Sequence, residues 1–151
     1  VLKTLWSKHR NFKVVVLGTS GSPYEFIDAK GYVKHKEIYN YTSKSHYGIL
    51  SFKPSTFNPM HETNKCYIYA VSGAIPIITS DMFDTIDKID GYSIMIDAQE
   101  FNNDLMRKYE ELLSMECDEV NKLRYNVFNY ARSNLYWEIQ EKTLIDAVKT
   151  A

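Results

Sequence analysis

The feature of this sequence that most constrains its fold is the alternation of short apolar runs with segments of helical period. Four runs rich in Val, Ile and Tyr, at 12–17, 47–52, 74–79 and 92–96, have the length and composition of strands. The run 12–17 is almost continuously apolar, so we expect that strand to be covered on both faces. Strands that alternate with helices in this order predict an α/β domain: a Rossmann-like parallel sheet with helices on both faces and right-handed crossovers.

The segments between and after these runs carry apolar side chains at spacings of three and four. They predict helices over 2–10, 35–45, 61–72, 99–113, 118–132 and 135–148, so that three helices close the chain at its C-terminus. Gly73 is expected to end the helix 61–72 as a C-cap. Two further apolar pieces, 24–27 and 31–33, predict one more short strand. Neither an internal repeat nor a low-complexity linker interrupts the pattern.

Composition places the chain among ordinary soluble domains of one-domain size. Its 151 residues carry a formal net charge of -1, which argues against nucleic acid as a partner. Cys66 and Cys117 lie far apart inside helical patterns, as expected of reduced thiols. The sequence shows no apolar stretch of about 18 residues and no apolar signal-peptide core at its start, so we expect a cytoplasmic protein.

Ligands of parallel α/β folds bind beyond the carboxyl ends of the strands, so the loops after Leu17, Phe52 and Thr79 are where function is expected. The first of these loops contains Gly18-Thr19-Ser20-Gly21, whose free amides suit a phosphate. The turn lacks the lysine of a Walker loop and the third glycine of a dinucleotide fingerprint. A plain turn between strands is the alternative interpretation.

The segment 61–66 opens the predicted helix that follows the second of these loops. Hydroxyl, amide and ammonium donors there coincide with the positive end of the helix dipole, which suits a diphosphate. Alternatively, Thr63 or Asn64 only caps the helix and Lys65 is a solvated lysine. His61, Glu62 and Cys66 match no standard zinc spacing, so no metal is expected.

Other candidate groups point to no chemistry. Asp81, Asp84, Asp87 and Asp90 recur every third residue, a pattern that predicts a solvated face. The chain contains no Asp-x-Asp pair of the kind that holds a metal and a diphosphate. No histidine stands near a serine or cysteine in a nucleophile-elbow context, so a hydrolase triad is not indicated.

The segment 64–80 resembles a hallmark of GT-B glycosyltransferases of the group 1 type. There an Asn-Lys-led helix ends at glycine and leads into a Gly-Leu-Pro-Val-Ile strand; here Gly73 leads into Ala-Ile-Pro-Ile-Ile. Upstream, 31–38 and 47–52 are similar to the family's Gly-Tyr-Val, His-Glu-Glu-Leu and Gly-Ile-Leu-Pro-Phe run. Downstream, 91–96 and 136–138 are similar to its last strand and its terminal Ser-Trp-Glu. These motifs keep the family's order across nearly the whole chain.

The resemblance implies one half of a GT-B fold: the C-terminal domain that binds a nucleotide diphosphate sugar. It implies a donor held without metal, and as partners an N-terminal domain and an acceptor glycan, lipid or protein, as in polysaccharide biosynthesis. By this comparison the chain is a single donor-binding domain that lacks the first strand and the acceptor domain, and the full-length protein could associate with a membrane.

The resemblance also assigns roles to individual residues. The base is expected near Tyr32 and Val33, and the diphosphate and sugar near the opening of the predicted helix 61–72. Lys65 would stabilise the leaving diphosphate. The set of predicted site residues consists of Lys65 and Glu62 as catalytic groups and Gly18, Tyr32, Val33, His61, Thr63 and Asn64 as donor-binding groups.

The sequence departs from the family where a carboxylate commonly binds the donor ribose. Ile68 stands at one position of the family's Glu pair and Met60 at the other, and Glu62 is the nearest carboxylate. This departure favours an alternative: a catalytically silent GT-B-like module that binds a partner or scaffolds an assembly. A flavodoxin-like or receiver-like domain is a weaker possibility, and Gly18-Thr19 stands where a receiver fold needs an acidic pair after its first strand.

Overall fold

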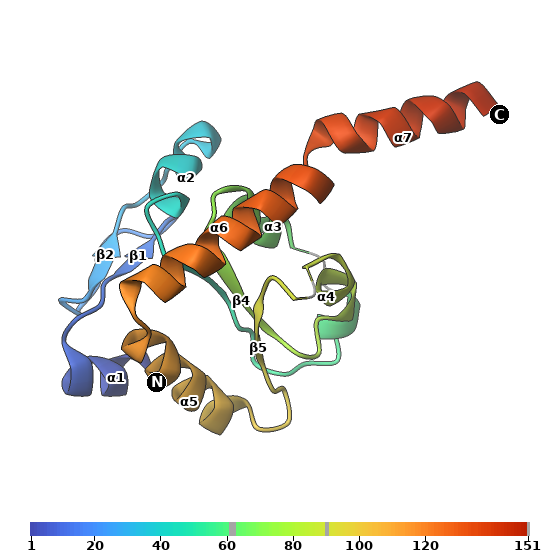
Figure 1. Cartoon of the computed structure of the whole chain (residues 1–151). Coiled ribbons are helices and arrows are strands. Elements are labelled where there is room, and N and C mark those ends of the chain that lie inside the picture. The colour runs from blue at the N-terminus through green and yellow to red at the C-terminus, as the bar shows by residue number, and fades with distance from the viewer. Residues whose placement is uncertain (61–62, 90, 151) are drawn as a thin grey trace.

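The computed structural model describes residues 1–60, 63–89 and 91–150, and it is an α/β structure (Figure 1). The helices are α1 (Leu2–His9), α2 (His35–Thr42), α3 (Asn64–Val71), α4 (Phe83–Ile89), α5 (Phe101–Ser114), α6 (Cys117–Asn134) and α7 (Trp137–Thr150), with a 3-10 turn η1 (Asn58–Met60). The strands are β1 (Val14–Val16), β2 (Ile27–Ala29), β3 (Tyr47–Leu50), β4 (Ile75–Thr79) and β5 (Ile94–Ile96). All strand pairs are parallel, as the alternation predicts.

The three-stranded sheet has the order β3-β4-β5 and contains the core. Every residue of the central strand β4 is buried. Its successive residues Ile77 and Ile78 point to opposite faces. Ile77 packs with Leu5 of α1 and Leu105 of α5, whereas Ile78 packs with Cys66 of α3 and residues of α4. The prediction of helices on both faces is therefore confirmed for this sheet.

The first two strands differ from the prediction. They form a separate parallel pair rather than part of one continuous sheet. Val15 of β1 is 38% exposed, so the expectation that this strand is covered on both faces is wrong. The second strand overlaps the predicted pieces only at Ile27 and is centred on Asp28. The carboxylate of Asp28 pairs with Lys13 (3.2 Å) and Lys30 (2.9 Å). A charged residue at the centre of β2 is stable here because the two strands lie at the surface and the ion pairs of Asp28 are accessible to water.

The turn that ends α3 follows the sequence prediction. Gly73 has φ +69°, a backbone conformation that glycine adopts without steric cost. The N–H of Ala74 donates to the carbonyl of Tyr69 (2.9 Å), and the N–H of Gly73 donates to that of Ala70 (3.0 Å), so the last carbonyls of the helix are satisfied. The chain then enters β4 directly.

Helix α4 is a structural element that the sequence pattern did not reveal. It has seven residues, with Thr85 and Ile89 buried, and Asp84 and Asp87 exposed. The solvated face predicted for the aspartates is confirmed at these two positions, while Asp90 lies outside the described residues. A helix of seven residues has only about two turns, which is too short for its apolar spacing to be recognised beside aspartates that recur every third residue.

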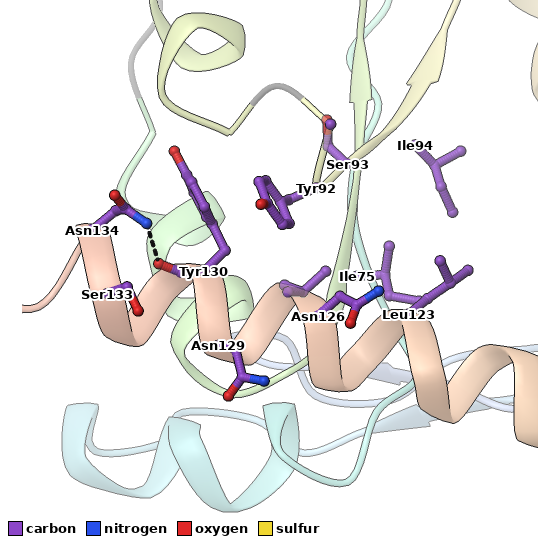
Figure 2. A pocket seen from close by; sticks show the side chains of 12 residues that line it. Ile75, Tyr92, Ser93, Ile94, Leu123, Asn126, Asn129, Tyr130, Ser133 and Asn134 are labelled. Atoms are coloured by element: carbon purple, nitrogen blue, oxygen red, sulfur yellow. Dashed lines mark hydrogen bonds between the residues drawn. The ribbon is translucent and has the colours of Figure 1, made fainter.

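Helix α6 runs across the amino ends of the strands, and α7 leads away from the body of the molecule (Figure 1). The guanidinium of Arg124 in α6 donates to the carbonyls of Gly73 (3.0 Å) and Ser43 (2.7 Å), which ties α6 to the ends of α3 and α2. The ring of Tyr130 stacks on Tyr92 (Figure 2). Among the described residues, no helix combines the length and the apolar character that a membrane span requires.

Candidate functional site

The candidate site lies at the carboxyl edge of the three-stranded sheet, where the loops after β3, β4 and β5 meet. The hydroxyl of Thr79 donates to the carbonyl of Phe52 (2.9 Å), which joins the first two loops. The N–H of Ala98 donates to the hydroxyl of Ser80 (2.9 Å), which joins the second and third. Sequence reasoning expected function in the loops after Phe52 and Thr79, and the structure brings those two loops into contact.

Asp81 is a functional candidate that sequence reasoning missed, because it was assigned to the solvated aspartate face. Its Oδ2 accepts from the side-chain amide of Asn58 (2.9 Å) and from the N–H of Ser55 (3.4 Å). Its Oδ1 is buried and has no hydrogen-bond partner among the residues that the structure describes. A buried, unpaired carboxylate oxygen costs free energy, and native structures contain few of them. The signal that distinguishes this residue from the other aspartates is its position two residues after the buried strand β4.

The start of α3 is the second part of the site. In a β3-α3-β4 unit of parallel strands the helix begins at the carboxyl edge and returns the chain to the amino edge. Thr63 is the N-cap, and its hydroxyl accepts from the N–H of Lys65 (3.3 Å), so the capping role considered for it is confirmed. Asn64 and Lys65 are exposed, and within the described part of the chain their side chains make no hydrogen bond or ion pair.

The other predicted site residues lie either beside the β1-β2 pair or outside the described residues. Gly18 and the segment containing Tyr32 and Val33 are close together, because the N–H of Gly18 donates to the carbonyl of Gly31 (2.7 Å). The ring of Tyr32 is 89% exposed and Val33 is half-buried. This group belongs to the β1-β2 pair, whereas Thr63, Asn64 and Lys65 belong to the three-stranded sheet. His61 and Glu62 lie outside the described residues.

The two positions that replace the family's glutamates offer no carboxylate. Ile68 is half-buried in α3, and Met60 is 73% exposed at the end of η1. Beside Met60, Phe57 and Phe83 are also largely exposed. The loop after β3 and the start of α4 therefore present apolar side chains around the hydrogen bond between Asn58 and Asp81.

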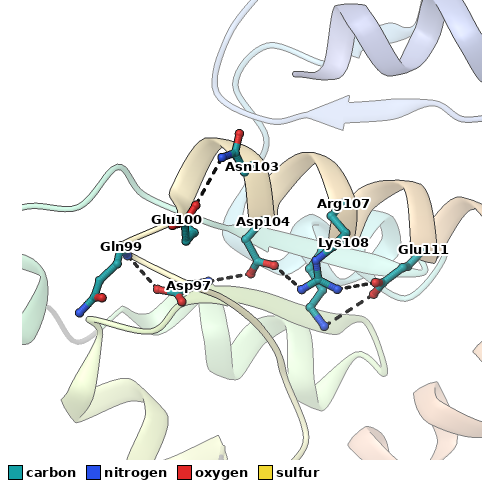
Figure 3. A network of polar contacts seen from close by, with 8 residues as sticks. All are labelled: Asp97, Gln99, Glu100, Asn103, Asp104, Arg107, Lys108 and Glu111. Carbon is teal, nitrogen blue, oxygen red and sulfur yellow. Dashed lines mark hydrogen bonds and ion pairs between the residues drawn. The ribbon is translucent and has the colours of Figure 1, made fainter.

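An acidic network supports the loop after β5 (Figure 3). The carboxylate of Asp104 accepts from the N–H of Asp97 (2.8 Å) and pairs with Arg107, which also binds Glu111 (2.5 Å). The hydrogen bond from Asp97 and the neighbouring guanidinium hold the pKa of Asp104 below its ordinary value. A carboxylate that is ionised and already paired acts as a structural clamp for this loop.

The comparisons with known proteins do not extend the sequence argument. No protein-family model, curated protein or solved structure matches the chain. The resemblance to GT-B glycosyltransferases therefore stays a prediction. The geometry provides an edge with three joined loops and a buried carboxylate oxygen. It also provides a helix start whose amide and ammonium groups have no partner in the described ranges. Over residues 1–60, 63–89 and 91–150, His, Cys, Asp and Glu side chains form no group of three that could hold a metal.

Proposed function

We propose that the chain is the donor-binding domain of a glycosyltransferase that moves a sugar from a nucleotide diphosphate sugar to an acceptor. The observation that carries the proposal is the start of α3, which opens at the carboxyl edge of a parallel sheet. There the side chains of Asn64 and Lys65 are exposed and have no partner among the described residues. The helix dipole, the side-chain amide of Asn64 and the ammonium group of Lys65 favour a bound diphosphate at this position.

The proposed chemistry is stabilisation of the leaving group. When the bond between the sugar and the diphosphate breaks, negative charge builds on the β-phosphate oxygen. Donors fixed by α3 and the ammonium group of Lys65 would stabilise that charge without needing a metal. We propose that an N-terminal domain binds the acceptor. The loop with Tyr32 and Val33 is proposed to contact the base of the nucleotide.

A second candidate function is a catalytically silent module of the same architecture. The specific observation in its favour is Ile68, which places a half-buried apolar side chain where the family commonly has a ribose-binding glutamate. Such a module would keep the sheet and the α3 packing and lose the donor. The two functions differ in whether the chain binds a nucleotide at all.

Calorimetric titration of the full chain with UDP-glucose, GDP-mannose, ADP-glucose, UDP and GDP separates the two candidates. The glycosyltransferase proposal expects saturable heat with at least one of them, and about tenfold weaker binding in Lys65→Ala. Lys122→Ala is the matched control, because it removes the same charge from an exposed lysine on α6. If no nucleotide gives heat, the silent module is supported. If Lys65→Ala and Lys122→Ala bind equally well, the role given to Lys65 is wrong.

A further inference from the structure

A groove lies at the amino edge of the three-stranded sheet, opposite the candidate donor site. It has a volume of about 470 Å³, is open to solvent, and is bordered by α6, by the first residues of β4 and β5 and by the segment 91–93 that leads into β5 (Figure 2). Ile75 and Ile94, the first residues of the two strands, form part of its base. A volume of this size lies within the range of small-ligand sites.

The groove is distinguished by the absence of charge among the described residues that line it. Twelve residues form its walls, and none is Asp, Glu, Lys, Arg or His. A quarter of the chain is charged, so a random set of this size would include about three charged residues. An uncharged wall in a charged chain favours an uncharged ligand.

Three polar side chains of the groove are available to bind a ligand. The side-chain amides of Asn126 and Asn129 and the hydroxyl of Ser133 come from neighbouring turns of α6. Within the described part of the chain, none of these three side chains has a hydrogen-bond partner. Each amide offers two donors and a carbonyl acceptor, and the hydroxyl offers both functions. Such groups can bind ligand hydroxyls that donate and accept at once.

An aromatic pair gives the groove a rigid apolar wall. The rings of Tyr92 and Tyr130 stack with centroids 3.8 Å apart and planes 16° apart. The hydroxyl of Tyr130 donates to the carbonyl of Lys88 (2.6 Å), which fixes its ring. Beside the pair, Ile75, Ile94 and Leu123 supply aliphatic surface. Aromatic and aliphatic walls with a few fixed polar groups can hold a ligand that has both C–H faces and hydroxyls.

We propose that this groove binds an uncharged oligosaccharide. A pyranose ring presents C–H groups for the tyrosine wall and hydroxyls for the amides of Asn126 and Asn129, and it carries no charge that would need a counter-ion. The proposal does not rest on the donor site, which lies at the other end of the strands. An extended peptide that adds to the open edge of β5 is the competing occupant.

The test is an NMR titration of the ¹⁵N-labelled full chain with three neutral probes, maltohexaose, cellohexaose and N-acetylchitohexaose. Hexagalacturonate serves as the charged comparison, and a hexapeptide of alternating Val and Thr represents the competing occupant. The proposal expects saturable shifts with at least one neutral saccharide at the amides of 91–94 and 126–134. It expects the double variant Asn126→Ala/Asn129→Ala to bind about tenfold more weakly, since two hydrogen bonds are lost.

Asn121→Ala is the matched control, because it removes an exposed amide from α6 outside the groove and should leave the affinity unchanged. Retention of the wild-type spectrum outside the groove shows that the double variant is folded. If the double variant does not fold, the single variant Asn129→Asp replaces it. This variant adds a charge at a partly exposed site and should also weaken binding. The proposal is overturned if no neutral saccharide shifts the groove amides at millimolar concentration, if hexagalacturonate binds equally well, or if only the peptide shifts them.

Discussion

Gly48 in β3 provides the sharpest test of how the site is positioned, because it lies under the ring of Tyr69 in α3. A Cβ atom at position 48 would lie 2.1 Å from Cδ2 and 2.2 Å from Cγ of that ring. Ordinary carbon contacts lie near 3.5 Å, so the ring would have to move by about 1.4 Å. Rotation of the ring about its own axis cannot move Cγ, so α3 itself must shift or the side chain must change rotamer.

Gly48→Ala is therefore expected to destabilise the fold. Overpacking of this kind costs about 1 to 3 kcal/mol, and we expect the upper end because the clash involves the root of a half-buried ring. The loss corresponds to a decrease in Tm of about 5 to 10 °C for a chain of this size. Urea denaturation followed by circular dichroism measures the free energy of unfolding.

A double-mutant cycle ties this loss to the ring. Tyr69→Ala alone is expected to cost about 2 to 3 kcal/mol, because it removes a half-buried ring. In the Tyr69→Ala background, however, Gly48→Ala should cost less than 0.5 kcal/mol, about the error of additivity. Gly21→Ala is the control, since a Cβ there meets open space, and its cost should not depend on Tyr69. Equal losses from Gly48→Ala in both backgrounds would refute the packing of β3 against α3.

Two further predictions follow from the electrostatics of buried groups. Asp104, whose folded-state pKa is depressed, stabilises the fold above the unfolded pKa of about 4, and this stability is lost as pH falls through the lower folded value. Asp104→Asn should thus cost about 1 to 2 kcal/mol in urea denaturation at pH 7 and much less near pH 2.5; a pH-independent difference would contradict the ion-pair account. Burial raises the pKa of the Cys66 thiol to about 12, while Cys117 is exposed. At pH 8 a thiol reagent should titrate one cysteine in the native chain and two in urea; rapid reaction of both in the native chain would show that α3 opens.

The sequence predicted those elements whose burial is uniform over a full strand or several helical turns. The residues of β4 are all buried, so the apolar run 74–79 predicted this strand. Helices α5 and α6 were predicted because their apolar residues repeat at helical spacing over several turns. Gly73 was predicted as the end of its helix because glycine is the residue that most often adopts the left-handed conformation found there.

The sequence could not predict the elements and residues that depend on tertiary contacts. Strand β2 has three residues around a charged one, Asp28, so no apolar alternation marks it. Asp81 recurs in step with Asp84 and Asp87, and its place two residues after the buried run is its one signal in the sequence. Its contact with Asn58 depends on the path of the loop after β3. That loop contains two prolines and no periodic pattern, so its path is set by contacts with α4 rather than by local propensity.

The measurement that tests the central claim most directly is an NMR titration of the ¹⁵N-labelled chain with UDP, GDP and ADP. The claim is that the start of α3 holds the diphosphate of a nucleotide sugar. It predicts that at least one of these nucleotides causes saturable shifts that are largest at the backbone amides of Thr63, Asn64 and Lys65. Absence of shifts with all three nucleotides, or shifts centred elsewhere on the chain, would contradict it.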